Sequence, residues 1–194
     1  MDLPLEPRKI GIFGGTFDPV HLGHIHLSTL AKEKLGLDEI HFIPCRISPH
    51  KPSSDVTSGQ DRYEMLQLAT AKLPWARVDD LEIRRDGPSF SYLTAEAMAS
   101  RFPGARLFWI MGSDQWDVLL NWRNPQRLAA LVEFIVLARG STPKPRDGFQ
   151  LHVVRVEHPA SASAIRIAIS KDEVALWLDP AVYKWIRSRR LYQA

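Results

Sequence analysis

Two histidines three residues apart follow a pair of glycines near the start of the sequence. The stretch GIFGGTFDPVHLGH covers residues 11–24 and ends in His21 and His24. Gly14 and Gly15 directly follow an apolar run, so the backbone there can adopt positive φ and a ligand can approach it closely. At the start of a helix, the two histidines share one face and offer N–H donors beside the free backbone N–H groups. This combination indicates a site for an anion such as a phosphate.

The same histidines admit other interpretations. Two surface histidines beside a tight turn would have the same spacing, and an HxxH pair also occurs in metal sites. However, the sequence has no HExxH, His26 falls elsewhere on the expected helix, and further zinc ligands cannot be assigned. The stretch matches neither GxGxxG nor GxxxxGK(S/T), so neither of those phosphate loops is indicated. The adjacent glycines favour nucleotide chemistry over a metal.

The elements that must position these residues alternate between strand-like and helix-like segments. We expect strands at 9–13, 39–44, 77–83, 106–112, 133–139 and 151–156. We expect helices at 24–36, after a Ser58 cap, at 92–102, 113–122 and 124–132, and in the tail from 161, with a break at 178–180. This alternation predicts an α/β fold with a mostly parallel sheet, helices on both faces and a small C-terminal helical part. Residues 1–194 are expected to form a single domain.

In such sheets ligands bind at the carboxyl ends of the strands. Functional residues should therefore gather in the loops that follow the expected strands, after residues 13, 44, 83, 112, 139 and 156. At one of these edges, Asp114 follows Gly112. Its carboxylate could accept hydrogen bonds from a ribose diol or cap the next helix, and the residues alone leave both roles open.

Composition narrows the function classes. The chain has 25 Lys and Arg against 22 Asp and Glu, and the net charge of +3 is too small to indicate a nucleic-acid or membrane partner. The single cysteine, Cys45, permits no internal disulfide, which fits a reducing compartment, and we interpret it as a bystander thiol. Without a signal peptide or a long apolar run, a cytoplasmic protein is expected. The oligomeric state stays open, a homo-oligomer included.

The stretch GGTFDPVHLGH resembles the signature of the nucleotidyltransferase superfamily with an HxGH motif. Such enzymes align an acceptor phosphate with the α-phosphate of a nucleoside triphosphate and expel pyrophosphate, usually with Mg²⁺. The resemblance implies a Rossmann-like nucleotidyltransferase fold and the catalytic donors His21 and His24. It also implies ATP contacts from Gly14, Gly15, Thr16 and Phe17. Asp18 belongs to the acceptor side and mainly fixes the turn, so Mg²⁺ is expected on the triphosphate and water, with no protein metal ligands.

Later stretches resemble the bacterial nicotinate-mononucleotide adenylyltransferases. They are SPHKP (48–52), DLEIRRDGPSFSYLT (80–94), FWIMGSDQWDVLLNWRNPQRL (108–128), FIVLARG (134–140) and SASAIR (161–166), followed by VYKWIRSRRLY. The likeness therefore covers nearly the whole chain, in order. The sequence departs from the family pattern at Ser48, where a second proline is usual, and at Ser91 and Ser163, where threonine is usual.

This resemblance implies further roles. Lys51 and Arg166 would join the two histidines as catalytic charges, and His50 would reach the acceptor phosphate. ATP would also contact Gly112, Asp114, Arg139 and Ser163. Trp122 would stack on the pyridine ring, with backbone groups near Ser91 and Trp122 on its carboxylate. Ordinary alternatives are solvated cations at Lys51 and Arg139, a packing role for Trp122, and plain helix caps at Ser161 and Ser163.

The implied reaction joins ATP and nicotinate mononucleotide into nicotinate adenine dinucleotide and pyrophosphate. The acceptor phosphate is already ionised at pH 7, so no general base is required. Three alternatives stay open: adenylyl or cytidylyl transfer to another phosphate-bearing acceptor, a non-catalytic nucleotide-binding module, and a metal-binding HxxH protein.

Overall fold

A single parallel sheet organises the protein, for which we have a computed structural model. The structure describes residues 6–49, 56–138, 140–155, 161–168 and 172–192. Its six strands are β1 (Lys9–Gly15), β2 (Glu39–Pro44), β3 (Ala76–Val78), β4 (Arg106–Gly112), β5 (Glu133–Ala138) and β6 (Leu151–Arg155). They lie in the order β3-β2-β1-β4-β5-β6, and every neighbouring pair is parallel. The order reverses direction between β1 and β4, which is where such sheets bind ligands.

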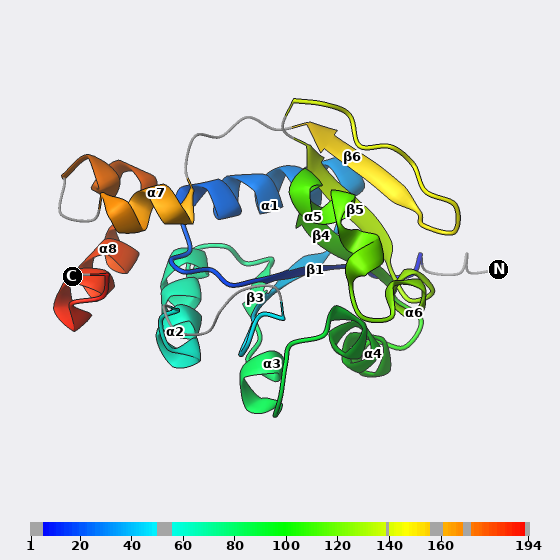
Figure 1. The fold of residues 1–194 in the computed structure, drawn as a ribbon, viewed down its shortest axis with the longest axis horizontal. Helices are drawn as coiled ribbons and strands as arrows, with labels where there is room; N and C mark the ends of the chain where they lie inside the picture. Colours follow the sequence, from blue (N-terminus) through cyan, green and yellow to red (C-terminus); the bar gives the residue numbers. More distant parts are fainter. Residues whose placement is uncertain (1–5, 50–55, 139, 156–160, 169–171, 193–194) are drawn as a thin grey trace.

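Helices cover both faces of this sheet (Figure 1). One apolar cluster joins Phe13 to α1 (Leu22–Leu35), α2 (Gly59–Thr70) and α8 (Pro180–Arg189). The other joins Ile10 and Ile12 of the same strand to α4 (Ser91–Arg101), α5 (Ser113–Asp117) and α6 (Pro125–Ala129). Alternate residues of β1 point to opposite faces, so one strand feeds both clusters. The predicted α/β fold is confirmed.

The predicted C-terminal helical part is present. It comprises α7 (Ala162–Ile167), the 3₁₀ segment η2 (Asp172–Trp177) and α8, with the break between them as expected. These elements lie at one end of the molecule, and α8 packs beside α2 (Figure 1). No helix in the described part of the chain has the length and apolar character needed to cross a bilayer.

Two predicted helix boundaries have the expected chemistry. Gly36 ends α1 in the left-handed conformation, with φ of 63°. Ser58 caps α2 through its hydroxyl, which accepts the backbone N–H of Asp61 at 3.1 Å.

Three predicted elements are wrong in part. Strand β3 ends at Val78, and residues 81–84 form the short helix α3 (Leu81–Arg84), because Asp79 Oδ1 accepts the Leu81 N–H at 3.0 Å and begins a turn. The expected helix at 113–122 divides into α5 and the 3₁₀ segment η1 (Leu119–Asn121). The expected helix at 124–132 ends at Ala129 because the chain must turn into the adjacent strand β5.

Candidate active site

A cavity of about 720 Å³ opens where the strand order reverses. Its walls come from the carboxyl ends of β1, β2 and β4, from the segment before α4 and from residues 121–123. The cavity contains many of the residues predicted from the sequence: Gly14, Gly15, Thr16, Phe17, His24, Ser91, Gly112, Asp114 and Trp122. The loops after β1, β2 and β4 therefore meet as expected.

The remaining predicted residues lie elsewhere. Asp18, His21, Ser163 and Arg166 are not part of the cavity wall, although the first two belong to the turn beside it. His50, Lys51 and Arg139 lie outside the described residues. The expected functional turn after residue 156 also lies outside them.

The two histidines of the opening motif pack against each other at the start of α1. Their ring centroids are 3.7 Å apart with 28° between the planes. His21 is the N-cap residue, and its backbone N–H donates to His24 Nδ1 at 3.2 Å. Because Nδ1 accepts this bond, the proton of the neutral His24 ring is on Nε2, which can serve as a donor. The predicted common face is confirmed, and His24 lines the cavity.

The glycine pair has a different conformation from the one expected. Gly14 and Gly15 continue β1, and positive φ occurs instead at Phe17, with φ of 51°. A Cβ on Gly14 would lie 3.1 Å from Trp109 Cζ2, and one on Gly15 would lie 3.0 Å from Phe17 Cζ. The glycines thus provide a bare backbone floor for the cavity, and the non-glycine turn residue carries the strain.

Residues 16–18 form a turn that is held by side chains from distant elements. The Asp18 carboxylate is buried, and its Oδ1 accepts the hydroxyl of Tyr192 at 2.6 Å. Arg166 Nη1 donates to the Asp18 carbonyl oxygen at 2.6 Å. Ser161 caps α7 by accepting the Ala164 N–H at 3.2 Å, which places Arg166 at this turn.

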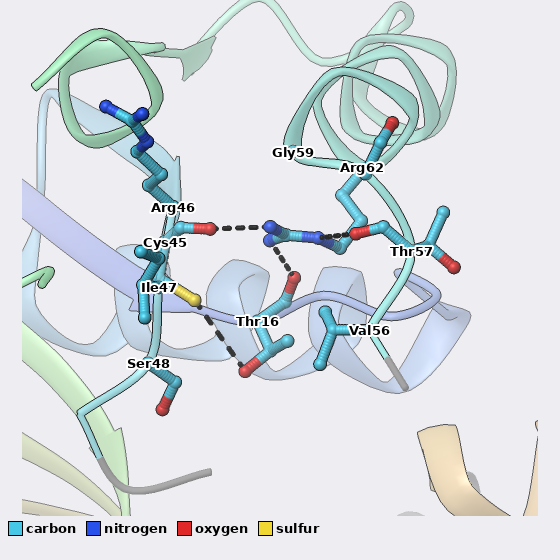
Figure 2. A pocket seen from close by; sticks show the side chains of 10 residues that line it. Thr16, Cys45, Arg46, Ile47, Ser48, Val56, Thr57, Gly59 and Arg62 are labelled. Atoms are coloured by element: carbon cyan, nitrogen blue, oxygen red, sulfur yellow. Dashed lines mark hydrogen bonds between the residues drawn. The ribbon is translucent and has the colours of Figure 1, made fainter. Parts of the chain in front are cut away.

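Arg62 is a functional residue that the sequence reasoning missed. Arg62 is 1% exposed. Its guanidinium donates to three backbone carbonyls, those of Thr57 (2.9 Å), Thr16 (2.7 Å) and Cys45 (2.6 Å) (Figure 2). It therefore joins the β1 turn, the end of β2 and the entry to α2. The available signal was its spacing from Met65 and Leu66, which puts Arg62 on the buried face of α2.

The three hydrogen bonds of Arg62 form what we call the Arg62 clamp. A smaller pocket of about 140 Å³ adjoins it and is lined by Thr16, Cys45 and Arg62 among others (Figure 2). Cys45 is buried. Burial raises the pKa of the Cys45 thiol despite the nearby Arg62 guanidinium. The thiol is therefore a poor nucleophile at neutral pH, which agrees with a bystander.

Glu82 is a second missed residue, a buried carboxyl in the cavity wall. Its Oε1 accepts the Thr94 hydroxyl at 2.6 Å, and Ser89 also bonds to it. Burial raises the pKa of Glu82 against these bonds. Ser89 Oγ in turn accepts the Arg46 backbone N–H at 3.0 Å, so Glu82 organises the segment before α4. Predicting residues 77–83 as a strand concealed this role.

Aromatic residues form another side of the cavity. Trp122 is half-buried, and its ring meets that of Trp109 edge to face, with centroids 6.4 Å apart. Trp109 and Trp116 are both buried. The cavity places Trp122 and Ser91 in the same space as His24.

In the part of the chain that the structure describes, the acidic residues do not form a metal site. Within the described ranges, no group of three or more His, Cys, Asp or Glu side chains is arranged to hold a metal ion. Asp114 is exposed at the cavity wall, and Asp18 is occupied by Tyr192.

Comparison with known proteins agrees with this geometry. The sequence profile of the cytidylyltransferase-like family matches residues 12–168. A probable nicotinate-nucleotide adenylyltransferase of Shouchella clausii is 36% identical, with 95% of this chain and 97% of that protein covered. The nicotinate-nucleotide adenylyltransferase of Bacillus subtilis is 35% identical, with 96% of this chain and all (100%) of that protein covered.

A solved structure shares the fold. The Plasmodium falciparum nicotinic acid mononucleotide adenylyltransferase, determined in complex with NaAD, superposes with a TM-score of 0.79. The two chains are 20% identical over 95% of this chain and 97% of the other. The family profile and the full-length similarity to the bacterial enzymes place the chain in the cytidylyltransferase-like family and, within it, among the nicotinate-nucleotide adenylyltransferases.

Proposed function

We propose that this protein transfers AMP from ATP to nicotinate mononucleotide and releases pyrophosphate, a step of NAD synthesis. The observation that carries the proposal is the cavity at the strand-order reversal, which brings the glycine floor, His24 and Trp122 into one space. Its volume of about 720 Å³ lies within the usual range of ligand-binding pockets. The bacterial relatives named for this activity match the chain over almost its entire length.

The reaction needs no protein nucleophile. An oxygen of the mononucleotide phosphate forms a bond to the α-phosphorus of ATP, and the bond from that phosphorus to the β-phosphate oxygen breaks. Pyrophosphate leaves with the electron pair, and no proton has to move at pH 7. The buried Cys45 thiol, with its raised pKa, therefore takes no part in the chemistry. Catalysis then rests on alignment of the two substrates and on neutralisation of charge.

The chain supplies that neutralisation at the start of α1. His24 Nε2 is a donor because Nδ1 is occupied by the His21 backbone N–H. The N-terminus of the fourteen-residue helix α1 adds its dipole and the backbone N–H groups of its first turn. His21, Lys51 and Arg166 are proposed to complete the set, with Arg166 held next to the turn by the Asp18 carbonyl.

The two substrates occupy different parts of the cavity in this proposal. ATP lies over Gly14, Gly15, Thr16 and Phe17 and reaches Gly112 and Asp114, with Ser163 and Arg139 as further contacts. The pyridine ring of the acceptor stacks on Trp122, and backbone groups near Ser91 bind its carboxylate. His50 contacts the acceptor phosphate, and Asp18 serves the acceptor side by fixing the turn between β1 and α1. Bare backbone at the glycines lets the triphosphate approach the end of β1.

Mg²⁺ is proposed as the cofactor, carried by the triphosphate. When bound, it would withdraw charge from the phosphate oxygens and help pyrophosphate to leave. Asp114 is the exposed carboxylate at the cavity that could hydrogen-bond water around the ion. EDTA treatment should abolish turnover and added Mg²⁺ should restore it. Elemental analysis of the dialysed protein should find less than stoichiometric zinc, which would reject the metal-binding alternative.

Pyrophosphate release tests the proposal directly. The purified protein with ATP and nicotinate mononucleotide should form nicotinate adenine dinucleotide, and nicotinamide mononucleotide is the matched neutral-ring acceptor. Absence of product with both would reject the proposed function, and turnover with another phosphate-bearing acceptor would favour the alternative reaction. Tight ATP binding without turnover of any acceptor would identify a nucleotide-binding module. A cytoplasmic location is also proposed, and cell fractionation tests it.

A further inference from the structure

We propose that Tyr192 is a positioning residue for the active site. Its phenol holds the Asp18 carboxylate and thereby fixes residues 16–18, the turn between β1 and α1. The hydroxyl donates to Asp18 Oδ1 at 2.6 Å across 174 positions of sequence. Thr16 and Phe17 of this turn line the cavity, and His21 follows the turn as the N-cap of α1.

The Asp18 carboxylate depends on this contact because it is buried. Asp18 is 4% exposed, and burial of a carboxylate without hydrogen-bond donors is costly in free energy. Its Oδ2 accepts the Thr57 backbone N–H at 3.4 Å, a longer bond than that from Tyr192. Arg166 bonds to the Asp18 carbonyl oxygen and leaves the carboxylate to other partners. Burial and the neighbouring carboxylate raise the pKa of Tyr192, so the phenol remains a donor at neutral and alkaline pH.

The backbone conformation after α8 places the Tyr192 phenol beside Asp18. Arg190 and Tyr192 have positive φ, 54° and 62°, and the Leu191 N–H donates to the Ile186 carbonyl at 3.0 Å. Leu191 and Tyr192 pack against the apolar cluster that also contains Phe17. Non-glycine residues keep positive φ only where surrounding contacts impose it. The ending of α8 is therefore a built structure, anchored also by Arg189 to Asp61 at 3.2 Å.

The 16–18 turn needs such external support because Phe17 itself has a φ of 51°. Arg62 holds the Thr16 carbonyl, Arg166 holds the Asp18 carbonyl, and Tyr192 holds the Asp18 side chain. Of these three contacts, only that from Tyr192 can be deleted by removing one oxygen atom. Loss of that atom should let the turn relax and move the donors at the start of α1 away from the reacting phosphates.

The test is Tyr192→Phe, assayed by pyrophosphate release well below its melting temperature. This readout rests on the proposed function, and wild-type turnover in the same assay separates failure of that function from failure of this inference. We expect kcat to fall about tenfold, the size expected for loss of one hydrogen bond to a charged group. Ile186→Val is the matched control, since it removes a buried methyl group from the same region of α8 without touching Asp18. It should lower the melting temperature and leave kcat within twofold of wild type.

A double-mutant cycle then shows whether Tyr192 acts through Asp18. In the Asp18→Asn background, adding Tyr192→Phe should lower kcat by less than twofold, because the Asp18 carboxylate that Tyr192 contacts is already absent. A tenfold loss in both backgrounds would overturn the inference. So would a Tyr192→Phe enzyme that loses thermal stability as Ile186→Val does and keeps its kcat. If Asp18→Asn does not fold, the comparison of the two single variants decides the question.

Discussion

The imidazole of His24 is held by two parts of His21, its ring and its backbone N–H. Its ring stacks on His21 at 3.7 Å, and its Nδ1 accepts the His21 backbone N–H at 3.2 Å. One nitrogen thus orients the ring, and the other is the donor that the proposed function assigns to the substrate. The two nitrogens can be separated by mutation, since asparagine places an acceptor near Nδ1 and has nothing near Nε2.

His24→Asn should therefore fold and lose activity. We expect a fall in kcat of about 10²–10³, the usual cost of one donor to developing charge. His24→Gln, which reaches toward Nε2, should keep more activity than His24→Asn, and His24→Ala should resemble His24→Asn in rate and be less stable. Steady-state kinetics with thermal melts would measure this. Near-normal turnover of His24→Ala would contradict the assigned role.

Arg62→Met should destabilise the protein strongly. It would leave the carbonyls of Thr57, Thr16 and Cys45 without their donor, at about 1–3 kcal/mol for each that stays buried and unsatisfied. We expect the free energy of unfolding to fall by at least about 3 kcal/mol in urea titrations. Arg84→Met, at an arginine whose side chain is 79% exposed, is the control and should change it by less than about 0.5 kcal/mol. Equal effects of the two substitutions would show that the clamp contributes little.

Trp122→Ala should weaken binding of the acceptor and leave binding of ATP unchanged. Loss of a stacking aromatic surface costs about 1–3 kcal/mol per base, so KM for nicotinate mononucleotide should rise at least about fivefold. Trp122→Phe retains an aromatic ring, so its KM for nicotinate mononucleotide should rise less. The KM for ATP is the internal control and should stay within twofold. A parallel rise in both constants would indicate that Trp122 supports the cavity as a whole.

Asp79 gives the protein a defined acid sensitivity. Its burial alone would raise its pKa, but the nearby His41 ring and the Arg101 guanidinium outweigh this and lower the pKa from 3.8 to about 2. A lowered folded-state pKa adds stability above 3.8 that is lost as pH falls toward 2. The free energy of unfolding should therefore be higher for wild type than for Asp79→Asn at pH 6. This difference between the two proteins should shrink by about 2 kcal/mol when the pH is lowered to 2. Asp86→Asn, at a carboxylate 98% exposed, should show no comparable change between these pH values, and a pH-independent Asp79→Asn effect would reject the assignment.

The sequence permitted prediction of the features that arise from local patterns. Apolar runs located the six strands, and the Ser58 and Gly36 signals located helix ends, because these depend on neighbours a few residues away. The histidine pair could be placed on one face for the same reason. The predicted strand at 77–83 was too long. Its apolar pattern extends to residue 83, but the Asp79 carboxylate accepts the Leu81 N–H and starts the helix at Leu81–Arg84.

The missed site residues are those whose partners are distant in sequence. The clamp at Arg62 joins residues 16, 45 and 57, and the Tyr192 bond to Asp18 spans almost the whole chain. Glu82 appears in the sequence as one more charge in the run DLEIRR, and only its burial beside Thr94 distinguishes it. No periodicity encodes such contacts, since they exist only once the strands have been ordered into a sheet.

The glycine floor at the end of β1 also limits how this enzyme can diversify. Gly14 and Gly15 belong to a central strand, and side chains there would crowd Trp109 and Phe17. Substitutions at this floor therefore have little room. Residues 89–91 and 121–123 lie in connecting segments, where side chains can change without breaking a strand ladder. A laboratory effort to redirect the enzyme to a new acceptor should randomise these two segments and leave the floor unchanged.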